Sequence, residues 1–522
     1  MTRAAAPPPV PALLAVLAAA GSGPVLPIEV VATALSELGC PLSFGEIRDQ
    51  VVRLGALISR SEPGTNEELL GLAHAEFVRP TVKEVERFKF SISDAHRAIA
   101  VAIDTITSER VYSYARGAGV RHHLAYGNPE AALLLIIALQ TTRAADNRDT
   151  WASCLPLFAS TLGEDHPATL IVRIFAARWR GESGDVGGAV RELEELLADR
   201  VRVSGVDDSD TLATRALLAR WRGESGDVGG AVRELEELLA DRVRVSGVDD
   251  PDTLATRALL ARWRGESGDV GGAIRELEEL LGDQIRVVGA YDDSTLAVRN
   301  NLAYLRGGSG DAAGAVREFE HLLIDQTRAI GADHPNTHGT RNNLAAIRGA
   351  SGDVSGAIRE YEQLLADRLR IVGADDPLTL TVRNNLARWR GESGDTAGAI
   401  HEFEQLLTDR LRISGAKHPH TLVVRATLAH LHGVSGDPVR AVREYEQLLA
   451  DQVRVTGDDH PATLVIRNNL AGWRAENGDL VGAIQEFEQL LIDRLRILGP
   501  QHPDTINNRI NLAQLQRLRF KT

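Results

Sequence analysis

The strongest constraint on this chain is a repeat of fixed length. Threonine recurs at positions 169, 211, 253, 295, 337, 379, 421, 463 and 505, and each step is 42 residues. Arginine follows every one of these threonines by four positions, and alanine follows the first eight by twenty. A period of this length is typical of solenoids, in which each unit buries its apolar face only against its neighbours.

Each unit contains the signals for two helices. The first begins at His or Asp followed by proline, as in His334-Pro335 and His460-Pro461, because a capping side chain satisfies free amides and proline suits the first helical position. It runs to a Gly-x-x-Gly-Asp break, such as residues 391–395. The second helix of that unit is predicted over residues 399–413 and ends before Gly415. Its predicted apolar stripe comprises Ala399, Ile400, Phe403, Leu406, Leu407 and Leu411.

The repeated motifs resemble those of a known family. In order they read N-N-L-A, G-D, G-A-I-x-E-F/Y-E-Q-L-L and G-x-x-H-P-x-T-L. They are similar to the 42-residue tetratricopeptide repeats (TPRs) of kinesin light chains and of many bacterial signalling proteins. The resemblance covers about residues 160 to 522, as eight full units and a closing helix from Thr505 to Leu518. It implies an all-α fold, a right-handed α-solenoid of helix hairpins.

The packing positions of the family are partly kept. Small residues occur where the two helices of a repeat cross, as at Ala303 and Ala315, and an aromatic follows at Phe319. The sequence departs from the family in the first helix, where arginine replaces an expected packing aromatic at positions 306, 348 and 390. We expect the stem of this arginine to pack over a neighbouring tryptophan such as Trp389.

The resemblance implies that the first helices line a concave face whose polar side chains bind an extended peptide. The asparagines expected there are Asn301, Asn343, Asn385, Asn469 and Asn511. The other candidates are Tyr304, Arg388 and, in units without the asparagine, Arg178, Arg220 and Arg262. Amides pair with any peptide backbone and arginine forms forked bonds with carboxylates, so a protein or peptide ligand of acidic character is predicted. In the alternative interpretation, the asparagines cap or bridge adjacent helices inside the stack.

Other repeated polar positions have a structural interpretation. Glutamate recurs at 192, 234, 276, 318, 360, 402, 444 and 486, and aspartate at 199, 241, 283, 325, 367, 409, 451 and 493. Together with the arginine after the repeated threonine, they predict an ion pair repeated along the stack. The histidines of the His-Pro turns have no second ligand three or four residues away, so we expect no metal site. We find no catalytic constellation and predict no cofactor.

Residues 1 to about 85 follow a different pattern. Short helices are predicted at 10–20, 27–35 and 44–54, followed by apolar runs at 56–61 and 69–78. The tripeptide Glu62-Pro63-Gly64 joins the two runs. Three helices and a hairpin are the order of a winged helix. In a DNA-binding winged helix the third helix faces the major groove, but here acidic residues balance Arg48 and Arg53 in that helix.

A second, weaker resemblance concerns this amino-terminal part. Residues 57–60, the segment around His74, residues 95–97 and residues 114–124 resemble the winged helix and helical linker that follow the nucleotide-binding module in bacterial STAND signalling ATPases. It covers roughly residues 1 to 140, and no G-x-x-x-x-G-K-S/T loop accompanies it. The predicted domains are a small winged-helix-like α+β domain at 1–85, a helical linker at 86–150 and the TPR solenoid at 151–522.

Charge and cysteine content exclude several classes of protein. The formal net charge of −14 disfavours a protein wrapped in nucleic acid. Two cysteines, Cys40 and Cys154, are too few for a disulfide framework. No run reaches the roughly 18 apolar residues of a membrane span. Residues 10–20 after Arg3 have features of a secretory signal, but prolines at 7–9 and 11 interrupt the start of the run, so a cytoplasmic protein is expected.

These patterns together predict a non-enzymatic protein-binding module. The predicted role is the sensor half of a STAND-type signalling system, in which the solenoid binds a protein or peptide and the winged helix contacts an ATPase in trans. A stand-alone TPR adaptor or scaffold is one alternative. A DNA-binding regulator with a TPR sensor is the other.

Overall fold

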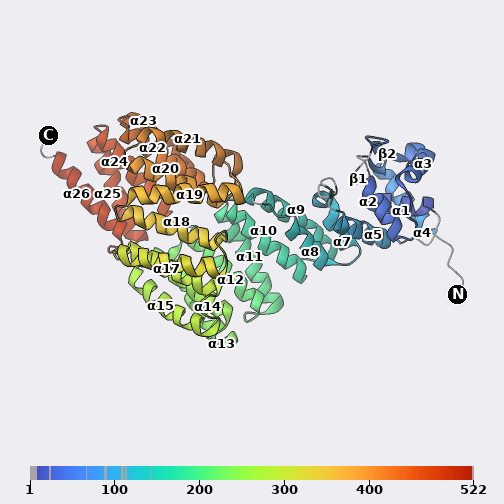
Figure 1. Ribbon diagram of the computed structural model, residues 1–522, viewed down its shortest axis with the longest axis horizontal. Coiled ribbons are helices and arrows are strands. Elements are labelled where there is room, and N and C mark those ends of the chain that lie inside the picture. The colour runs from blue at the N-terminus through green and yellow to red at the C-terminus, as the bar shows by residue number, and fades with distance from the viewer. Residues whose placement is uncertain are drawn as a thin grey trace. The chain divides into compact units, whose positions relative to one another are not determined.

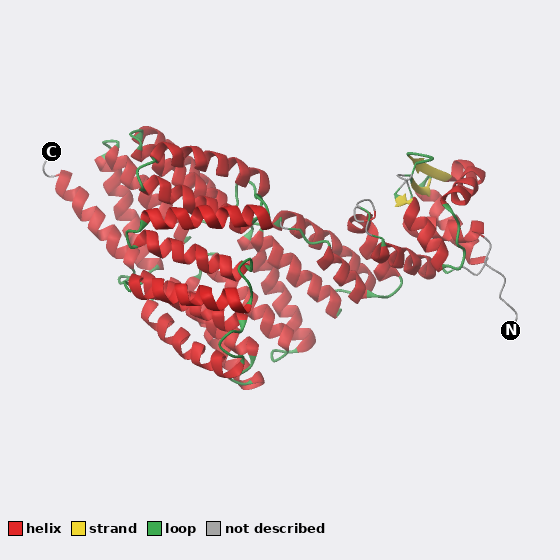
Figure 2. Cartoon of the chain, viewed as in Figure 1, coloured by secondary structure: helices red, strands yellow, loops and turns green. Residues whose placement is uncertain are grey.

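The computed structural model describes residues 9–22, 25–65, 68–87, 91–106, 108, 111, 114–141 and 143–519 (Figure 1). The chain divides into two compact units. The N-terminal unit comprises Met1–Thr141 and Asp146–Ala176, and the repeat unit comprises Thr142–Ala145 and Ala177–Thr522. Figure 2 shows helices throughout both units and a small group of strands in the N-terminal unit.

The N-terminal unit begins with a winged helix, as predicted. Its helices are α1 (Pro9–Ala20), α2 (Ile28–Glu37) and α3 (Phe44–Leu54), and its strands are β1 (Leu26–Pro27), β2 (Ile58–Ser61) and β3 (Leu69–Leu72). The strands form an antiparallel sheet in the order β1-β3-β2, with Ile58 opposite Leu72. The second apolar run was expected to extend to Val78, but β3 ends at Leu72. The turn η2 (Ala75–Phe77) then leads into α4 (Val78–Arg87).

Further helices complete this unit. They are α5 (Ile92–Thr105), the π-helical turn η3 (Ala115–Gly119), α7 (Val120–Ala125), α8 (Pro129–Ala138) and α9 (Ala144–Leu162). The apolar run after the prolines forms α1, which packs against α2, α4 and α5 and buries Leu13, Val16 and Leu17 completely. This run is therefore part of the folded core. Arg3, Pro7 and Pro8, which entered the secretory-signal argument, lie outside the described residues.

The repeat unit is an α-solenoid of helix hairpins. The first helices of the repeats are α10 (Pro167–Glu182), α12 (Ser209–Glu224), α14 (Pro251–Glu266), α16 (Asp293–Gly308), α18 (Pro335–Ala350), α20 (Pro377–Glu392), α22 (Pro419–Val434) and α24 (Pro461–Glu476). The second helices are α11 (Val186–Ser204), α13 (Val228–Ser246), α15 (Val270–Val287), α17 (Ala312–Ala329), α19 (Val354–Ile371), α21 (Thr396–Ile413), α23 (Pro438–Thr456) and α25 (Leu480–Ile497). The closing helix is α26 (Pro503–Arg519).

The caps of these helices follow from the repeated residues. His460 accepts a hydrogen bond from the backbone N–H of Ala462 at 3.0 Å, so the His-Pro turn does cap a first helix. Asp395 caps the second helix α21 by accepting from the N–H of Gly398 at 2.9 Å. A Cβ on Gly398 would lie 2.2 Å from the Asp395 carboxylate, which explains the glycine of the repeated G-A pair.

The packing of α21 differs from its predicted stripe. The helix begins at Thr396, one turn earlier than expected, because Asp395 is its cap. Ala399, Phe403 and Leu406 are buried as predicted. Leu411 is 44% exposed, and the preceding Arg410 is buried in its place with an exposed fraction of 3%. An apolar period alone does not reveal that a charged side chain takes an interior position.

The small residues of each repeat lie in the core as predicted. Ala303, Ala315 and Phe319 belong to one apolar cluster with Leu344 and Ile347 of the next first helix. Each hairpin therefore buries its stripe against the following one, which is the stacking that a repeat of this length requires.

The ion pair predicted along the stack is confirmed. Arg215 of α12 donates to Glu234 at 2.8 Å and to Asp241 at 2.6 Å, both on α13. The same triad forms around Arg257, Arg299, Arg341 and Arg467. These side chains are half-buried, so each triad fixes the two helices of one hairpin in register. In two further repeats Arg383 and Arg425 pair with Asp409 and Asp451, while Glu402 and Glu444 contact Arg390 and Arg440. The repeated arginine and aspartate are accordingly structural, and the glutamate joins them in the five triads.

Candidate functional site

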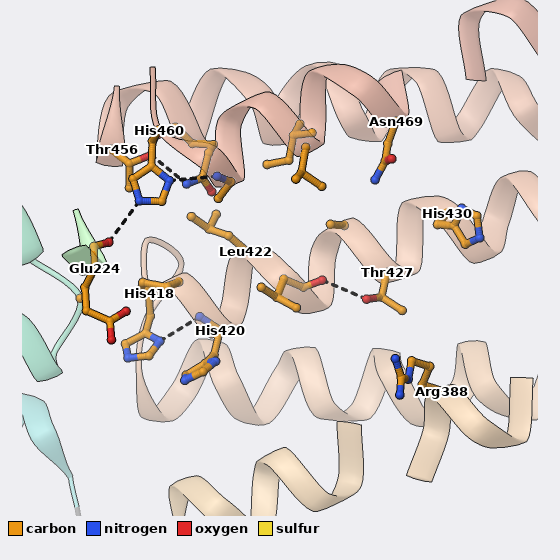
Figure 3. Close-up of a pocket in the computed structure, with 18 of the residues that line it drawn as sticks. Glu224, Arg388, His418, His420, Leu422, Thr427, His430, Thr456, His460 and Asn469 are labelled. Atoms are coloured by element: carbon orange, nitrogen blue, oxygen red, sulfur yellow. Dashed lines mark hydrogen bonds between the residues drawn. The ribbon is translucent and has the colours of Figure 1, made fainter. Parts of the chain in front are cut away.

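The solenoid contacts itself across a large sequence separation. The turn that follows α10 lies against the start of α22, and the turn that follows α12 lies against the start of α24. His418 Nε2 is 3.4 Å from the carbonyl oxygen of Glu182, and His460 Nε2 is 3.2 Å from that of Glu224, a contact drawn in Figure 3. In each pair the two residues are 236 positions apart in the sequence. We call these two contacts together the seam.

The chemistry of the seam depends on neutral histidine. In His418 and His460, Nδ1 accepts a backbone N–H at the helix cap, so Nε2 carries the hydrogen that is donated across the seam. Burial lowers the pKa of both imidazoles, against the raising effect of the carbonyl bond. One His-Pro turn thus caps a first helix and also joins two distant repeats.

Opening the seam requires only small substitutions. A Cβ on Gly184 would lie 3.1 Å from the Pro419 ring, and one on Gly226 would lie 2.7 Å from the Pro461 ring. We expect the double variant G184A/G226A to separate the two sides of the seam and to increase the radius of gyration in small-angle X-ray scattering.

The control for this experiment is G310A/G352A. Gly310 and Gly352 have the same positive φ, +117° and +100°, but have no atom within 4 Å of an added Cβ. The backbone strain is therefore matched and only the contact differs. Identical scattering curves from the two double variants would show that the seam does not hold the solenoid closed.

A cavity of about 1140 Å³ lies inside the solenoid next to the seam. Helices α20, α22, α23 and α24 form most of its wall, and the ends of α10 and α12 close one side. Figure 3 shows His420, Thr427, His430 and Asn469 along this wall. Residues from early and late repeats thus meet around one cavity because the seam brings them together.

The wall combines apolar and polar side chains. Val423, Val434 and Val465 line the cavity although they are 53%, 55% and 45% exposed. Exposed apolar groups in a concave site with a few polar groups are typical of ligand pockets. Neighbouring side chains of the cavity partly desolvate His420 and lower its pKa, with nearby Arg410 adding to the effect, although the residue itself is exposed. This imidazole is therefore neutral near pH 7.

The arginines at the cavity already have partners. Arg220 donates to Glu182 at 3.0 Å, and Arg262 donates to Glu224 at 2.7 Å. Their guanidinium groups lie 4.8 Å from the Trp221 ring centre and 4.7 Å from that of Trp263. Arg388 stacks in the same way on Trp389 at 4.8 Å, with a looser contact to Glu392 at 3.9 Å. Arg388 is consequently the least neutralised arginine of the three.

The cavity brings together four of the predicted site residues. They are Arg220, Arg262, Arg388 and Asn469. The remaining predicted residues, Arg178, Asn301, Asn343, Asn385, Asn511 and Tyr304, are not part of its wall. Arg178 lies near the Trp179 ring at 5.7 Å, Tyr304 is 51% exposed, and Asn511 borders a smaller cavity of about 310 Å³.

Some of the asparagines connect neighbouring first helices. Asn343 donates to Asn300 at 3.2 Å, and Asn385 donates to Asn342 at 2.9 Å. Each bond joins one repeat to the one before it, and Asn301 accepts from Asn300 at 3.4 Å within its own helix. These contacts correspond to the bridging role that was the alternative to ligand binding. Ligand binding by these asparagines stays a prediction.

Sequence reasoning missed the residues that make this cavity distinctive. His420, Val423, His430 and Val465 line it, and none of them was a candidate. A signal was present, because the repeat that contains α22 has Ala426 and Thr427 where its neighbours have the asparagine pair. A repeat that departs from the others is the natural place to search for a specific function.

The expectation for the arginines that replace the family aromatic is wrong. Arg390 does not stack on Trp389. It donates to Glu362 of the preceding repeat at 2.7 Å and also contacts Glu402. Arg306 and Arg348 likewise bond the preceding second helix, through Glu278 at 2.6 Å and Glu320 at 2.7 Å. The arginine that stacks on the Trp389 ring is Arg388, two positions earlier.

The winged helix uses its own arginines internally. Glu68 is 1% exposed and accepts from Arg48 of α3 at 2.8 Å and from Arg60 of β2 at 2.6 Å. These bonds lower the pKa of Glu68 against the effect of burial, so its carboxylate is charged. Because they hold a carboxylate, these two arginines are not available for DNA phosphates.

The described residues hold neither a candidate metal site nor a membrane-spanning helix. In that part of the chain, no group of three or more His, Cys, Asp and Glu side chains is placed to hold a metal ion. None of the helices in the same residues combines the length and hydropathy of a membrane span.

Comparisons with known proteins concern the repeats. A tetratricopeptide repeat family model matches residues 337–412, and a second model of the same description matches 295–336 and 463–504. The chain therefore carries tetratricopeptide repeats, which mediate protein–protein interaction and are typically non-catalytic. No curated protein sequence gave a significant match.

Several solved structures are similar to parts of the chain. Nearly identical TPR-like repeats of a kinesin light chain from Podosopora anserina share 25% identity over 38% of this chain and 95% of theirs, with a TM-score of 0.34. BtubC from P. vanneervenii shares 21% identity over 44% and 91%, with a TM-score of 0.36. A STAND protein with a tetratricopeptide repeat sensor from Pyrococcus horikoshii shares 14% identity over 94% and 65%, with a TM-score of 0.48.

Proposed function

We propose that the tetratricopeptide repeats of this chain bind an extended, mainly apolar segment of a partner protein in the cavity beside the seam. The observation that carries this proposal is the cavity of about 1140 Å³ whose wall exposes Val423, Val434 and Val465. Arg388, Thr427 and Asn469 offer hydrogen bonds to the backbone of such a segment. No catalytic role is proposed.

To test this, the labelled full chain is incubated with an array of random decapeptides and the bound signal is measured. The variant V423D/V465D places two carboxylates on the apolar wall, and we expect it to lose at least about tenfold in bound signal because each charge is desolvated by the ligand. The control V206D/V248D adds the same charges at valines that are each 58% exposed and are not part of the wall. Equal losses in the two variants would contradict the proposal.

A second part of the proposal concerns the role of the N-terminal unit in signalling. We propose that the chain is the sensor half of a STAND-type signalling system and that its winged helix contacts a nucleotide-binding module in another chain. The proposal is supported by the winged-helix order of α1 to β3 and by internal use of Arg48 and Arg60, which disfavours DNA as the partner. Crosslinking in the native cells followed by mass spectrometry tests it. Crosslinks from residues 9–141 to a P-loop ATPase support it, and crosslinks only to other protein classes refute it.

A further inference from the structure

One buried position in the second helices alternates between arginine and glutamine. The residues are Arg200, Arg242, Gln284, Gln326, Arg368, Arg410, Gln452 and Arg494, and none is more than 5% exposed. Each lies next to the start of the following first helix. A charged side chain at such a depth requires a partner, because desolvation of a lone charge is costly.

Three of the five arginines pair with a carboxylate at the next helix start. Arg200 donates to Asp210 at 3.0 Å, and Arg242 lies 2.9 Å from Asp252. Arg368 pairs with the capping carboxylate of Asp376 at 2.5 Å. Arg494 instead donates to a neutral acceptor, the carbonyl oxygen of Asp504, at 2.9 Å. The acid is either the cap of the first helix or the second residue after it.

Arg410 is the exception. It is 3% exposed, and within the described residues it has neither an ion pair nor a side-chain hydrogen bond. Its Nε has no partner, as in the other four arginines, so the difference lies in the two terminal nitrogens. The two positions that supply the acid in the other repeats are His418 and His420 here, and the first turn of α22 contains no acidic residue. The arginine is kept, but the described residues supply no counter-charge for it.

The surroundings of Arg410 are electropositive. Burial lowers its pKa to about 10, and nearby Arg383 adds to this effect. The amino-terminal end of α22 adds the partial positive charge of a helix dipole at the same place. His418 and His420, which feel the charge of Arg410, both line the cavity, as Figure 3 shows. Arg410 itself is not in the cavity wall, but His418 and His420, which occupy the acid positions of the other repeats, are. An anion bound at the position of the missing acid would therefore lie next to the cavity and beside a helix start.

We propose that Arg410, at the start of α22, is a carboxylate-binding subsite next to the cavity, on the side lined by His418 and His420. The carboxylate is supplied by the bound segment, either by an acidic side chain or by a free C-terminus, and takes the place that Asp210 and Asp252 occupy in the other repeats. A planar guanidinium suits a carboxylate through two parallel bonds. This inference rests on the proposed function, because it names one chemical group of the segment that binds there.

The chain itself suggests the variants that test this subsite. R410Q introduces the residue found at positions 284, 326 and 452, so the fold tolerates it. H420D places an aspartate at the position that Asp210 and Asp252 hold in their repeats. This carboxylate should pair with Arg410 and so block the subsite. R200Q is the matched control, because Arg200 occupies the equivalent position but is already paired with Asp210.

The experiment uses the full chain on random decapeptide arrays printed with amidated and with free C-termini. We expect wild type and R200Q to prefer peptides with a carboxylate at one position by about tenfold over the matching amide, the usual effect of a charge-assisted bond. R410Q and H420D should keep the apolar preference and lose the carboxylate preference. The two formats distinguish a side-chain carboxylate from a terminal one. Wild-type binding without a carboxylate preference would overturn the inference.

An array that shows no binding at all would refute the proposed function. A second measurement tests the subsite independently of that result. The melting temperature is measured in sodium acetate and in sodium chloride at equal ionic strength. Acetate should raise it more than chloride for wild type and R200Q, but not for R410Q or H420D. H420D should also melt at a higher temperature than wild type in chloride. Equal shifts in all four proteins would overturn the subsite.

Discussion

Replacing Gly349 by alanine is expected to lower the free energy of unfolding by about 1 to 3 kcal/mol, the usual cost of overpacking a core. Gly349 is in the last turn of α18, and the indole of Trp389 from the next repeat packs against it. An added Cβ would lie 2.5 Å from that ring. The ring is rigid and only 4% exposed, so it cannot move aside without shifting the stack.

The matched control is Gly265→Ala. Gly265 holds the same position in its repeat, but the next repeat has Leu305 instead of tryptophan, and its nearest atom is 3.5 Å from the added Cβ. This variant should be neutral or more stable, because alanine is favoured over glycine in a helix by up to about 1 kcal/mol. Urea denaturation followed by circular dichroism measures both variants. Equal destabilisation would show that tryptophan packing does not restrict this position.

Lowering the pH from about 6.5 to 4 is expected to open the N-terminal unit before the repeats lose their helices. Burial, together with nearby Arg121, lowers the pKa of His96 from 6.5 to about 4. The pKa of His122 is also far below its usual range, because burial lowers it and nearby His96 and Arg121 add to the effect. In the unfolded chain these imidazoles titrate near 6.5. Their contribution to stability is therefore complete above pH 6.5 and is lost as the pH falls toward 4. For His96 this is about 3 kcal/mol.

The acidic groups of the repeats respond at lower pH. Bonds to Arg215 and Arg257 hold the pKa values of Asp241 and Asp283 below their ordinary value. The stability from these carboxylates is present above about pH 4, the pKa of unfolded aspartate, and is lost only below it. The ion-pair triads should therefore survive the interval in which the histidines of the N-terminal unit are protonated. The seam histidines His418 and His460 also have lowered pKa values, so the seam loses stability in the same interval while the hairpins keep their triads.

The two cysteines make this difference measurable. Cys40 and Cys154 are both buried in the N-terminal unit and neither forms a disulfide. Their reactivity toward 4,4′-dithiodipyridine should rise between pH 6.5 and 4, while the far-ultraviolet circular dichroism of the repeats is retained. Thiols that stay protected down to pH 4 would contradict the expected loss of stability.

The order of helices and strands was predictable where local signals are strong. The His-Pro and Gly-Asp breaks place both helices of each repeat, because caps and turns depend on residues a few positions apart. The same holds for the three helices and the hairpin of the winged helix. The predicted end of the apolar run that forms β3 was wrong. Apolar residues continue from β3 through a turn into α4, and hydrophobicity alone does not separate these elements.

The candidate site was predictable only in part. Equivalent positions identified the Arg215 triad correctly, because its members repeat together. The same reasoning could not say which arginine stacks on Trp389, since Arg388 and Arg390 both recur and only the packed helices decide which of them faces the ring. Comparison of equivalent positions also could not show that Arg410 is buried without an acidic partner. That depends on which residues lie at the start of the next helix, α22.

The sequence by itself determined the repeat, its two helices and the bonds inside each hairpin, because these depend on residues within one 42-residue unit or its neighbour. Only the tertiary structure decided that the turns after α10 and α12 meet the starts of α22 and α24, and hence where the cavity lies. The physical reason is that a solenoid accumulates a small rotation at every repeat. Contacts across 236 residues follow from the sum of those rotations, and no single repeat encodes that sum.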